Sequence, residues 1–172
     1  MRWEYWRHNV LFSWQWLFLV GAAVGLTFIW ARLVRWESAK IQLLYGLLIF
    51  LFSTIADTIG GELQLWDYPK MFLPWGPRAV EIDWMISIFS MLAFQYAPRW
   101  RSFIPVTIGM ATLFAFVFEP LAKWMQIYRE IAWSPLYSFP IYIAMCCGFK
   151  LAAEGFASWA KKRSSAQPRQ PA

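Results

Sequence analysis

Three acidic residues at the ends of predicted membrane helices are the side chains best suited to chemistry in this sequence. Asp57 closes one apolar run, Asp83 opens the next, and Glu119 closes a later one. Because successive membrane helices alternate in direction, these positions fall on one side of the membrane at similar depth. Acidic groups at hydrocarbon depth are costly and by default face a cavity or a partner. We therefore predict that Asp57, Asp83 and Glu119 form a catalytic site.

The spacing of neighbouring polar residues supports this prediction. Residues three, four or seven positions apart share one face of a helix. Three groups meet that spacing: Ser53 with Asp57, Asp83 with Ser87, and Thr112 with Ala115 and Glu119. We expect each group to face the interior of a bundle. Carboxyl groups that share an apolar pocket repel one another as anions, so at least one keeps its proton and can serve as a general acid.

The same acids also have a purely structural interpretation. They can lie just outside the hydrocarbon and pair with Arg78, Lys123 or Arg129. Glu81 and Asp83 are also well placed to stabilise the first turn of a helix. The sequence leaves both interpretations open.

Large aromatic side chains surround the acids along the chain. Trp and Tyr are enriched at membrane–water interfaces, which explains most of them individually. Aromatic faces also stabilise cations in dry pockets, including developing carbocations. The predicted substrate-binding residues are Trp66, Tyr68, Trp84, Trp124, Tyr128, Trp133 and Tyr137.

Composition excludes an ordinary soluble domain. The 172 residues are 59% hydrophobic and 15% charged, whereas soluble domains are about 45–50% apolar and about 25% charged. Aromatic residues make up 20% of the chain, which excludes disorder. The net charge of +6 lies in short basic clusters between apolar runs, as in membrane loops, so nucleic acid is not a predicted partner.

Five apolar runs are long enough to cross a bilayer, which takes about 20 residues. We predict an all-α, polytopic membrane helix bundle without a sheet, in a single domain over residues 1–157. The predicted spans are residues 9–31, 39–60, 80–97, 103–119 and 134–156. Small residues from Gly21 to Gly25 would let another helix approach the first span closely. The last span begins at Ser134 and Pro135, with a kink expected at Pro140.

Two segments outside the spans have their own character. Residues 61–79 hold three prolines and several large aromatics, which predicts an interfacial or re-entrant cover. Residues 158–172 are basic and predicted to be a disordered tail next to lipid. One side of the membrane carries six Lys and Arg residues and the other ten, counting the tail. The positive-inside rule then places this multi-pass protein in the cell membrane with its N-terminus outside and its C-terminus in the cytoplasm.

Motifs for metals, cofactors and nucleophilic catalysis are missing from the sequence. The two cysteines, Cys146 and Cys147, are adjacent in an apolar span and support neither a disulfide framework nor a zinc site. His8 is the only histidine, which argues against Ser–His and Cys–His catalysis. No glycine-rich nucleotide motif is present. We therefore predict no cofactor and no metal site.

The order of these motifs resembles that of a known family, the small CBO0543-type integral membrane proteins of spore-forming bacteria. The resemblance spans residues 52–143 and is carried by ADTIGGELQLWDYPKMFLPWGPRAVEIDWMISIFSMLAFQYAPRW, FVFEPLAKW and IYREIAWSPLYSFPIY. It covers Asp57, Thr58, Tyr68, Pro69, Asp83, Trp84, Glu119 and Trp133. Pro120 departs from it, since the family more often has an aromatic residue there. The resemblance implies the same three acids but no activity.

A second likeness is mechanistic. Small membrane cyclases of isoprenoids, such as the fungal meroterpenoid cyclases and the heterodimeric lycopene cyclases, are similar in being short, helical, aromatic-rich and dependent on buried carboxylic acids. In such a cyclase or isomerase, Asp83 or Glu119 would be the general acid and Asp57 its partner. The alternatives are a protein that binds or transports a lipid or cation, and a structural membrane partner without catalysis. Predicted partners are membrane lipids, a hydrophobic isoprenoid and a second copy of the chain.

Overall fold

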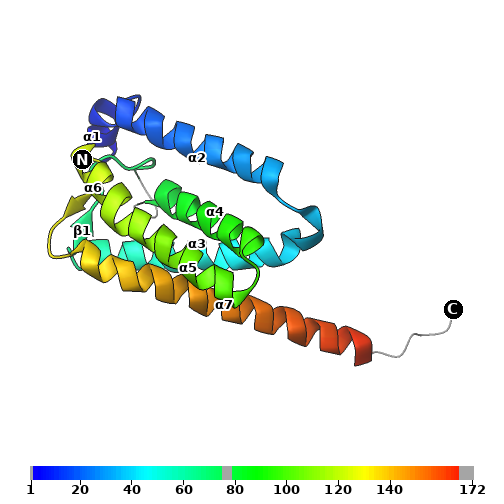
Figure 1. The fold of residues 1–172 in the computed structure, drawn as a ribbon. Coiled ribbons are helices and arrows are strands. Elements are labelled where there is room, and N and C mark those ends of the chain that lie inside the picture. Colours follow the sequence, from blue (N-terminus) through cyan, green and yellow to red (C-terminus); the bar gives the residue numbers. More distant parts are fainter. Residues whose placement is uncertain (1, 75–78, 167–172) are drawn as a thin grey trace.

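The computed structural model of the protein describes residues 2–74 and 79–166, which fold into one helix bundle (Figure 1). The predicted all-α class is confirmed. The α-helices are α1 (Arg2–Asn9), α2 (Trp14–Leu33), α3 (Ala39–Glu62), α4 (Val80–Tyr96), α5 (Trp100–Leu113), α6 (Glu119–Trp124) and α7 (Pro135–Ala166). A 3₁₀ turn, η1 (Trp36–Ser38), precedes α3, and a π-helical segment, η2 (Phe114–Phe118), joins α5 to α6.

Four helical segments are long and apolar enough to cross a membrane: Trp14–Leu33, Trp36–Glu62, Trp100–Trp124 and Pro135–Arg163. By length and composition the chain is a polytopic membrane protein. The remaining predicted span, residues 80–97, forms α4, whose 17 residues rise about 25 Å, just short of the roughly 30 Å hydrocarbon core. α4 lies at the centre of the bundle, in contact with α2, α3 and α5.

The core is centred on the crossing of α3 and α4. Tyr45 of α3 stacks on Phe94 of α4 with ring centroids 4.7 Å apart. Gly46 lets the two helices meet, because a Cβ atom there would lie 2.4 Å from the Sδ atom of Met91. The Ser87 hydroxyl donates a hydrogen bond of 2.6 Å to the Gly46 carbonyl oxygen. Ser87, predicted to accompany Asp83, is therefore part of this crossing.

The first predicted span begins later than expected. The chain turns between α1 and α2, where Phe12 has a φ of 59°, and the Ser13 side chain caps the start of α2. Gly21 and Gly25 of the predicted small-residue patch face open space, because a Cβ atom at either position would meet no atom of another segment within 4 Å. These two glycines are therefore not needed for helix contacts among the described residues.

The helix that carries Glu119 continues past its predicted end, to Trp124. Pro120 lies in the first turn of α6, where a missing N–H costs least. In η2 the Glu119 N–H donates to the Phe114 carbonyl, five residues back. This wider turn rotates Glu119 relative to Thr112. The prediction that Thr112 shares the inward face is wrong, since its side chain is exposed and bonds the Ile108 carbonyl.

The last helix is also longer than predicted. Ser134 and Pro135 begin it as expected, with the Leu136 N–H donating to the Ser134 hydroxyl. It then runs through Pro140 to Ala166. The predicted disordered tail is therefore wrong for residues 158–166, where alanine and lysine are good helix formers. Residues 167–172 of that prediction lie outside the described residues.

A two-stranded antiparallel sheet, absent from the prediction, ties two loops together. Its strands are β1 (Trp66–Asp67) and β2 (Arg129–Glu130), with Trp66 opposite Glu130. Gln64, two residues after the end of α3, and Gln126, two residues after the end of α6, each have a positive φ. Such left-handed residues close a helix and redirect the chain. Strands of two residues are too short to leave an alternating pattern in the sequence.

Replacing Gly46 by valine should destabilise the bundle by about 1–3 kcal/mol, because the added methyl groups overlap Met91. Thermal unfolding in detergent measures the effect. Gly21→Val, at a position with open space, is the matched control and should change stability by no more than about 0.5 kcal/mol. Equal stability of the two variants would contradict the close crossing of α3 and α4.

The orientation in the membrane remains a prediction. A C-terminal fusion to green fluorescent protein should fluoresce, and a C-terminal fusion to alkaline phosphatase should be inactive, if the C-terminus is cytoplasmic as the positive charges predict. The opposite pattern would reverse the orientation and place the acidic side of the bundle in the cytoplasm.

Candidate functional site

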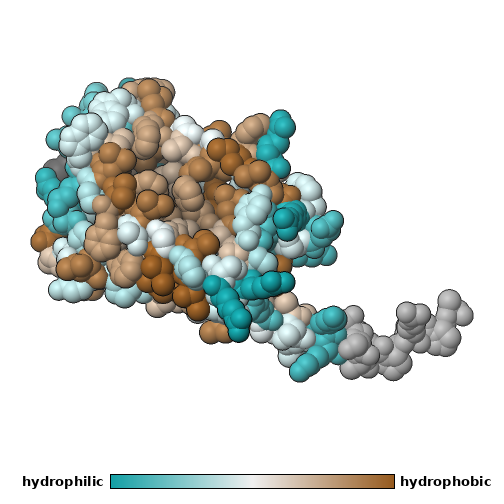
Figure 2. All heavy atoms as spheres, in the orientation of Figure 1, coloured by the Kyte–Doolittle hydropathy of each residue, from teal (hydrophilic) through white to brown (hydrophobic). Residues whose placement is uncertain are grey.

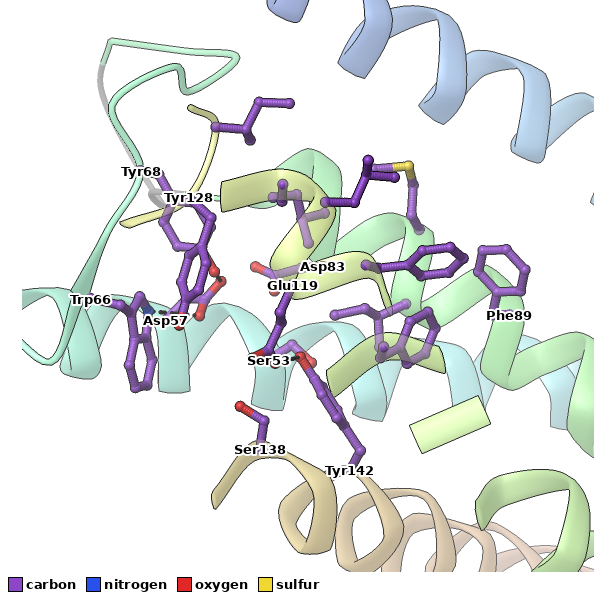
Figure 3. A pocket seen from close by; sticks show the side chains of 18 of the residues that line it. Ser53, Asp57, Trp66, Tyr68, Asp83, Phe89, Glu119, Tyr128, Ser138 and Tyr142 are labelled. Atoms are coloured by element: carbon purple, nitrogen blue, oxygen red, sulfur yellow. Dashed lines mark hydrogen bonds between the residues drawn. The ribbon is translucent and has the colours of Figure 1, made fainter. Parts of the chain in front are cut away.

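A cavity of about 530 Å³ lies between α2, α3, α4, the η2–α6 segment and α7. Its size is typical of a small-molecule pocket, about 300–1,000 Å³. All three predicted acids line it, and Figure 3 shows them reaching it from three different elements. Asp57 comes from the end of α3, Asp83 from the start of α4 and Glu119 from the start of α6. The structure therefore brings together the residues predicted to meet.

Asp57 is held by two aromatic donors from the loop after α3. Its Oδ1 accepts a hydrogen bond of 3.1 Å from Trp66 Nε1, and its Oδ2 accepts one of 3.0 Å from Tyr68 Oη. Gly60 makes this possible, because a Cβ atom there would lie 2.1 Å from the Trp66 ring. Donors on both oxygens stabilise a charged carboxylate.

Asp83 lies next to Asp57 and is only 1% exposed. The Thr54 hydroxyl donates to its Oδ2 over 3.0 Å. The Asp83 and Asp57 carboxyl groups lie close enough to interact electrostatically. Two carboxylate charges this close in an apolar site repel each other, so one of the two groups keeps its proton. Because Asp57 already accepts two other bonds, the proton is best placed on Asp83.

Of the two carboxyl oxygens of Glu119, one accepts a hydrogen bond from a described residue and the other accepts none. Its Oε1 accepts a hydrogen bond of 3.1 Å from Tyr142 Oη, whereas its buried Oε2 has no described partner. A buried polar atom without a partner costs about 1–3 kcal/mol. Such an atom beside a cavity is suited to a ligand.

Two tyrosines close the polar end of the cavity. Tyr68 and Tyr128 are both buried, with ring centroids 5.4 Å apart. Burial raises the pKa of Tyr68 above its ordinary range, and the nearby Asp57 charge raises it further. Burial likewise raises the pKa of Tyr128, with a further contribution from Glu119. Both phenols therefore keep their protons at physiological pH and remain donors.

Four of the seven aromatic residues predicted to bind substrate line the cavity: Trp66, Tyr68, Tyr128 and Trp133. The other three do not. Trp84 follows Asp83 in α4 and therefore points to a different face of the helix. Its Nε1 donates a hydrogen bond of 2.8 Å to the Thr27 hydroxyl of α2. Trp124 is 78% exposed and Tyr137 is 58% exposed. As cavity residues these three predictions are wrong, because each side chain lies on another face of its helix.

The structure adds residues that sequence reasoning missed. Ser138 and Tyr142 of α7 both line the cavity, and their spacing of four residues on an apolar helix was a usable signal. Ser53, which was predicted, lines it as well. Glu81 is buried beside the cavity-covering loop rather than in the cavity, where its Oε1 accepts from the Phe72 N–H over 3.2 Å.

The loop after α3 covers the polar end, as predicted for its described part. Trp66 and Tyr68 reach down to Asp57. Two tryptophans hold the loop from above: Trp6 donates to the Met71 carbonyl and Trp16 to the Phe72 carbonyl, each over 3.1 Å. Residues 75–78 of this predicted cover lie outside the described residues.

The described lining of the cavity contains no Lys, Arg or His. Lys123, a predicted partner of the acids, instead pairs with Glu130, and Lys150 pairs with Glu154. Arg78, another predicted partner, falls outside the described residues. Within the described part of the chain, no group of three or more His, Cys, Asp or Glu side chains is placed to hold a metal ion. The three carboxyl groups therefore face the cavity with hydrogen-bond donors but no described cation.

No family model, no curated protein and no solved structure matches this chain. Fold and site together define a polytopic helical membrane protein with an acid-lined internal cavity.

Replacing Tyr68 by phenylalanine should destabilise the protein by about 1–3 kcal/mol, because the buried Asp57 carboxylate loses a donor. The effect should persist up to pH 9, since the Tyr68 phenol stays protonated there. Thermal unfolding over a pH series measures it. Tyr137→Phe, at an exposed phenol, should leave stability within about 0.5 kcal/mol. Equal effects of the two substitutions would argue against the Tyr68–Asp57 bond.

Proposed function

We propose that the protein is an acid-initiated cyclase or isomerase of a neutral isoprenoid. One observation carries this proposal: three carboxyl groups without a described cation meet at one end of an apolar cavity. Protonating an alkene needs an acid that is kept uncharged, dry surroundings and walls that tolerate a carbocation. The cavity supplies each of these from residues of the chain.

In this mechanism Asp83 is the general acid. The alkene π electrons take the Asp83 proton, forming a C–H bond and leaving a carbocation on the neighbouring carbon. The neighbouring Asp57 charge favours the protonated form of Asp83 beforehand. A second double bond then attacks the cation and closes a ring, which leaves a cyclic carbocation. This carbocation loses a proton to the Glu119 carboxylate at Oε2, the oxygen without a described partner, and becomes the neutral product. The substrate is isomerised without oxidation or reduction, and proton exchange with water resets the acids.

The aromatic walls, and a described lining without Lys, Arg or His, indicate the substrate class. Trp66, Tyr68, Tyr128 and Trp133 present aromatic rings to the cavity and can stabilise the cation. Isoprenoid diphosphates need Lys, Arg or a metal to balance their charge, whereas the described lining is acidic. A neutral alkene, alcohol or epoxide therefore fits this site better than a diphosphate.

A second candidate function uses the same groups without chemistry. Carboxylates with aromatic walls also bind amphiphilic ammonium ions, and the free Glu119 oxygen favours such a ligand. A purely structural role would leave the cavity and its unpaired oxygen without a purpose. The family resemblance, and membrane lipids or a second copy as partners, stay predictions.

Purified protein in lipid vesicles should be incubated with squalene, geranylgeraniol and oxidosqualene, followed by mass spectrometry of organic extracts. Wild type should form an isomer of altered retention time. Asp83→Asn should lower the rate by at least about a hundredfold, because general acid catalysis contributes about 10²–10⁴. Asp57→Asn and Glu119→Gln should also slow the reaction.

Glu37→Gln is the matched control, because Glu37 is an exposed acid in η1, outside the cavity. It should keep the wild-type rate. Product formation that survives Asp83→Asn would refute the acid assignment. Tight binding of dodecyltrimethylammonium without any conversion would favour the second candidate.

A further inference from the structure

Helix α2 stands apart from most of the bundle. It packs principally on α4, and the hydrogen bond from Trp84 to Thr27 ties the two helices together. Figure 1 shows α2 along one edge, with α5 on the other side of α4 and α6 near the N-terminal end of the bundle. The residues that α2 adds to the cavity lie on one helical face: Phe18, Leu19, Ala22 and Leu26. One wall of the cavity is thus a helix whose backbone packs mainly on α4, while its Leu19 side chain also packs with Met125 and Ile127 after α6.

The opposite rim is formed by the π-helical segment and α6. Phe118 and Leu121 line the cavity and are also exposed on the surface of the bundle. A π-helical turn interrupts regular helix packing and is frequent at functional sites. Figure 2 shows a recess within the hydrophobic surface between α2 and the α5–α6 region. The cavity therefore opens sideways between these two rims.

Both rims belong to membrane-spanning segments, Trp14–Leu33 and Trp100–Trp124. The opening therefore faces lipid rather than water. From Phe18 to Leu26 the α2 wall rises about 12 Å, and every α2 residue on it is apolar. The other end is closed towards water by Tyr68 and Tyr128, which are both buried.

We propose that the ligand is a single-chain, membrane-dissolved amphiphile that enters from the bilayer through a portal between α2 and the η2–α6 segment. Its uncharged or cationic head would reach the acids, and its chain would lie along the apolar α2 wall. An anionic head is excluded by the carboxyl groups at the polar end. The portal rests on the proposed binding role of the cavity but not on the proposed chemistry.

A reversible cross-link across the portal tests this route. Ala22 and Phe118 line the cavity from the two rims. The double variant Ala22→Cys/Phe118→Cys should be joined by a short bifunctional methanethiosulfonate, with mass spectrometry to verify the link. The probe is tritiated farnesol in phosphatidylcholine vesicles. Each single-cysteine variant, treated with the same reagent, is the control and also accounts for Cys146 and Cys147.

Farnesol loaded before cross-linking should stay trapped when excess empty vesicles are added, and farnesol added afterwards should be excluded. The rate of farnesol release and the rate of farnesol uptake should each fall at least about tenfold, because the lipid-facing route is then blocked. Cleaving the linker with dithiothreitol should restore exchange. Unchanged exchange in protein with the verified link would overturn the portal.

A second pair of variants keeps the test decisive if the double variant does not fold. Ala22→Trp should slow farnesol exchange at least about fivefold, because the indole narrows the opening. Val24→Trp, on the same helix at a side chain 64% exposed, should leave exchange unchanged. Equal exchange in the two variants would overturn the portal.

The two proposals fail in different ways. Gated exchange of farnesol without any conversion supports the portal and refutes the cyclase. Conversion that continues in cross-linked protein supports the cyclase and refutes the portal. If wild type binds neither farnesol nor dodecyltrimethylammonium, the proposed ligand class is wrong and both proposals fall.

Discussion

The gathering of three carboxyl groups at one end of an apolar cavity is the constraint that organises this structure. Charged groups removed from water need partners, and here the described partners are neutral donors rather than cations. Trp66 and Tyr68 bind Asp57, Thr54 binds Asp83, and Tyr142 binds Glu119. Repulsion between Asp57 and Asp83 further keeps a proton on one of these two groups. The polar end is therefore a hydrogen-bonded unit that no single helix could form.

Local irregularities in the backbone place these donors and acceptors. The π-helical segment turns Glu119 towards the cavity, and Pro120 follows where its missing N–H matters least. Gly60 leaves room for the Trp66 ring over α3. The short β1–β2 pair links the loop that carries Tyr68 to the one that carries Tyr128. Each device sits at the end of the bundle where the acids meet, which is typical of functional sites.

The opposite wall of the cavity is built for access. The backbone of α2 packs mainly on α4, and beyond the contact of Leu19 with Met125 and Ile127 its apolar face lines the cavity. A tightly closed acid cluster beside a loosely held apolar wall suits a ligand with one polar end and one apolar chain. Lipid-soluble ligands reach such a site without crossing water, which is the physical link between the proposed chemistry and the proposed portal.

The sequence by itself determined the membrane class and the approximate helices, and it predicted, without deciding, that Asp57, Asp83 and Glu119 meet. These follow from length, hydropathy and the alternating direction of spans, which are local or nearly local properties. Only the tertiary structure decided which aromatics face the cavity, because neighbours such as Asp83 and Trp84 differ by about 100° around one helix. It alone decided the π-helical turn, the β1–β2 pair and the contributions of Ser138 and Tyr142, since each depends on contacts between segments far apart in the chain.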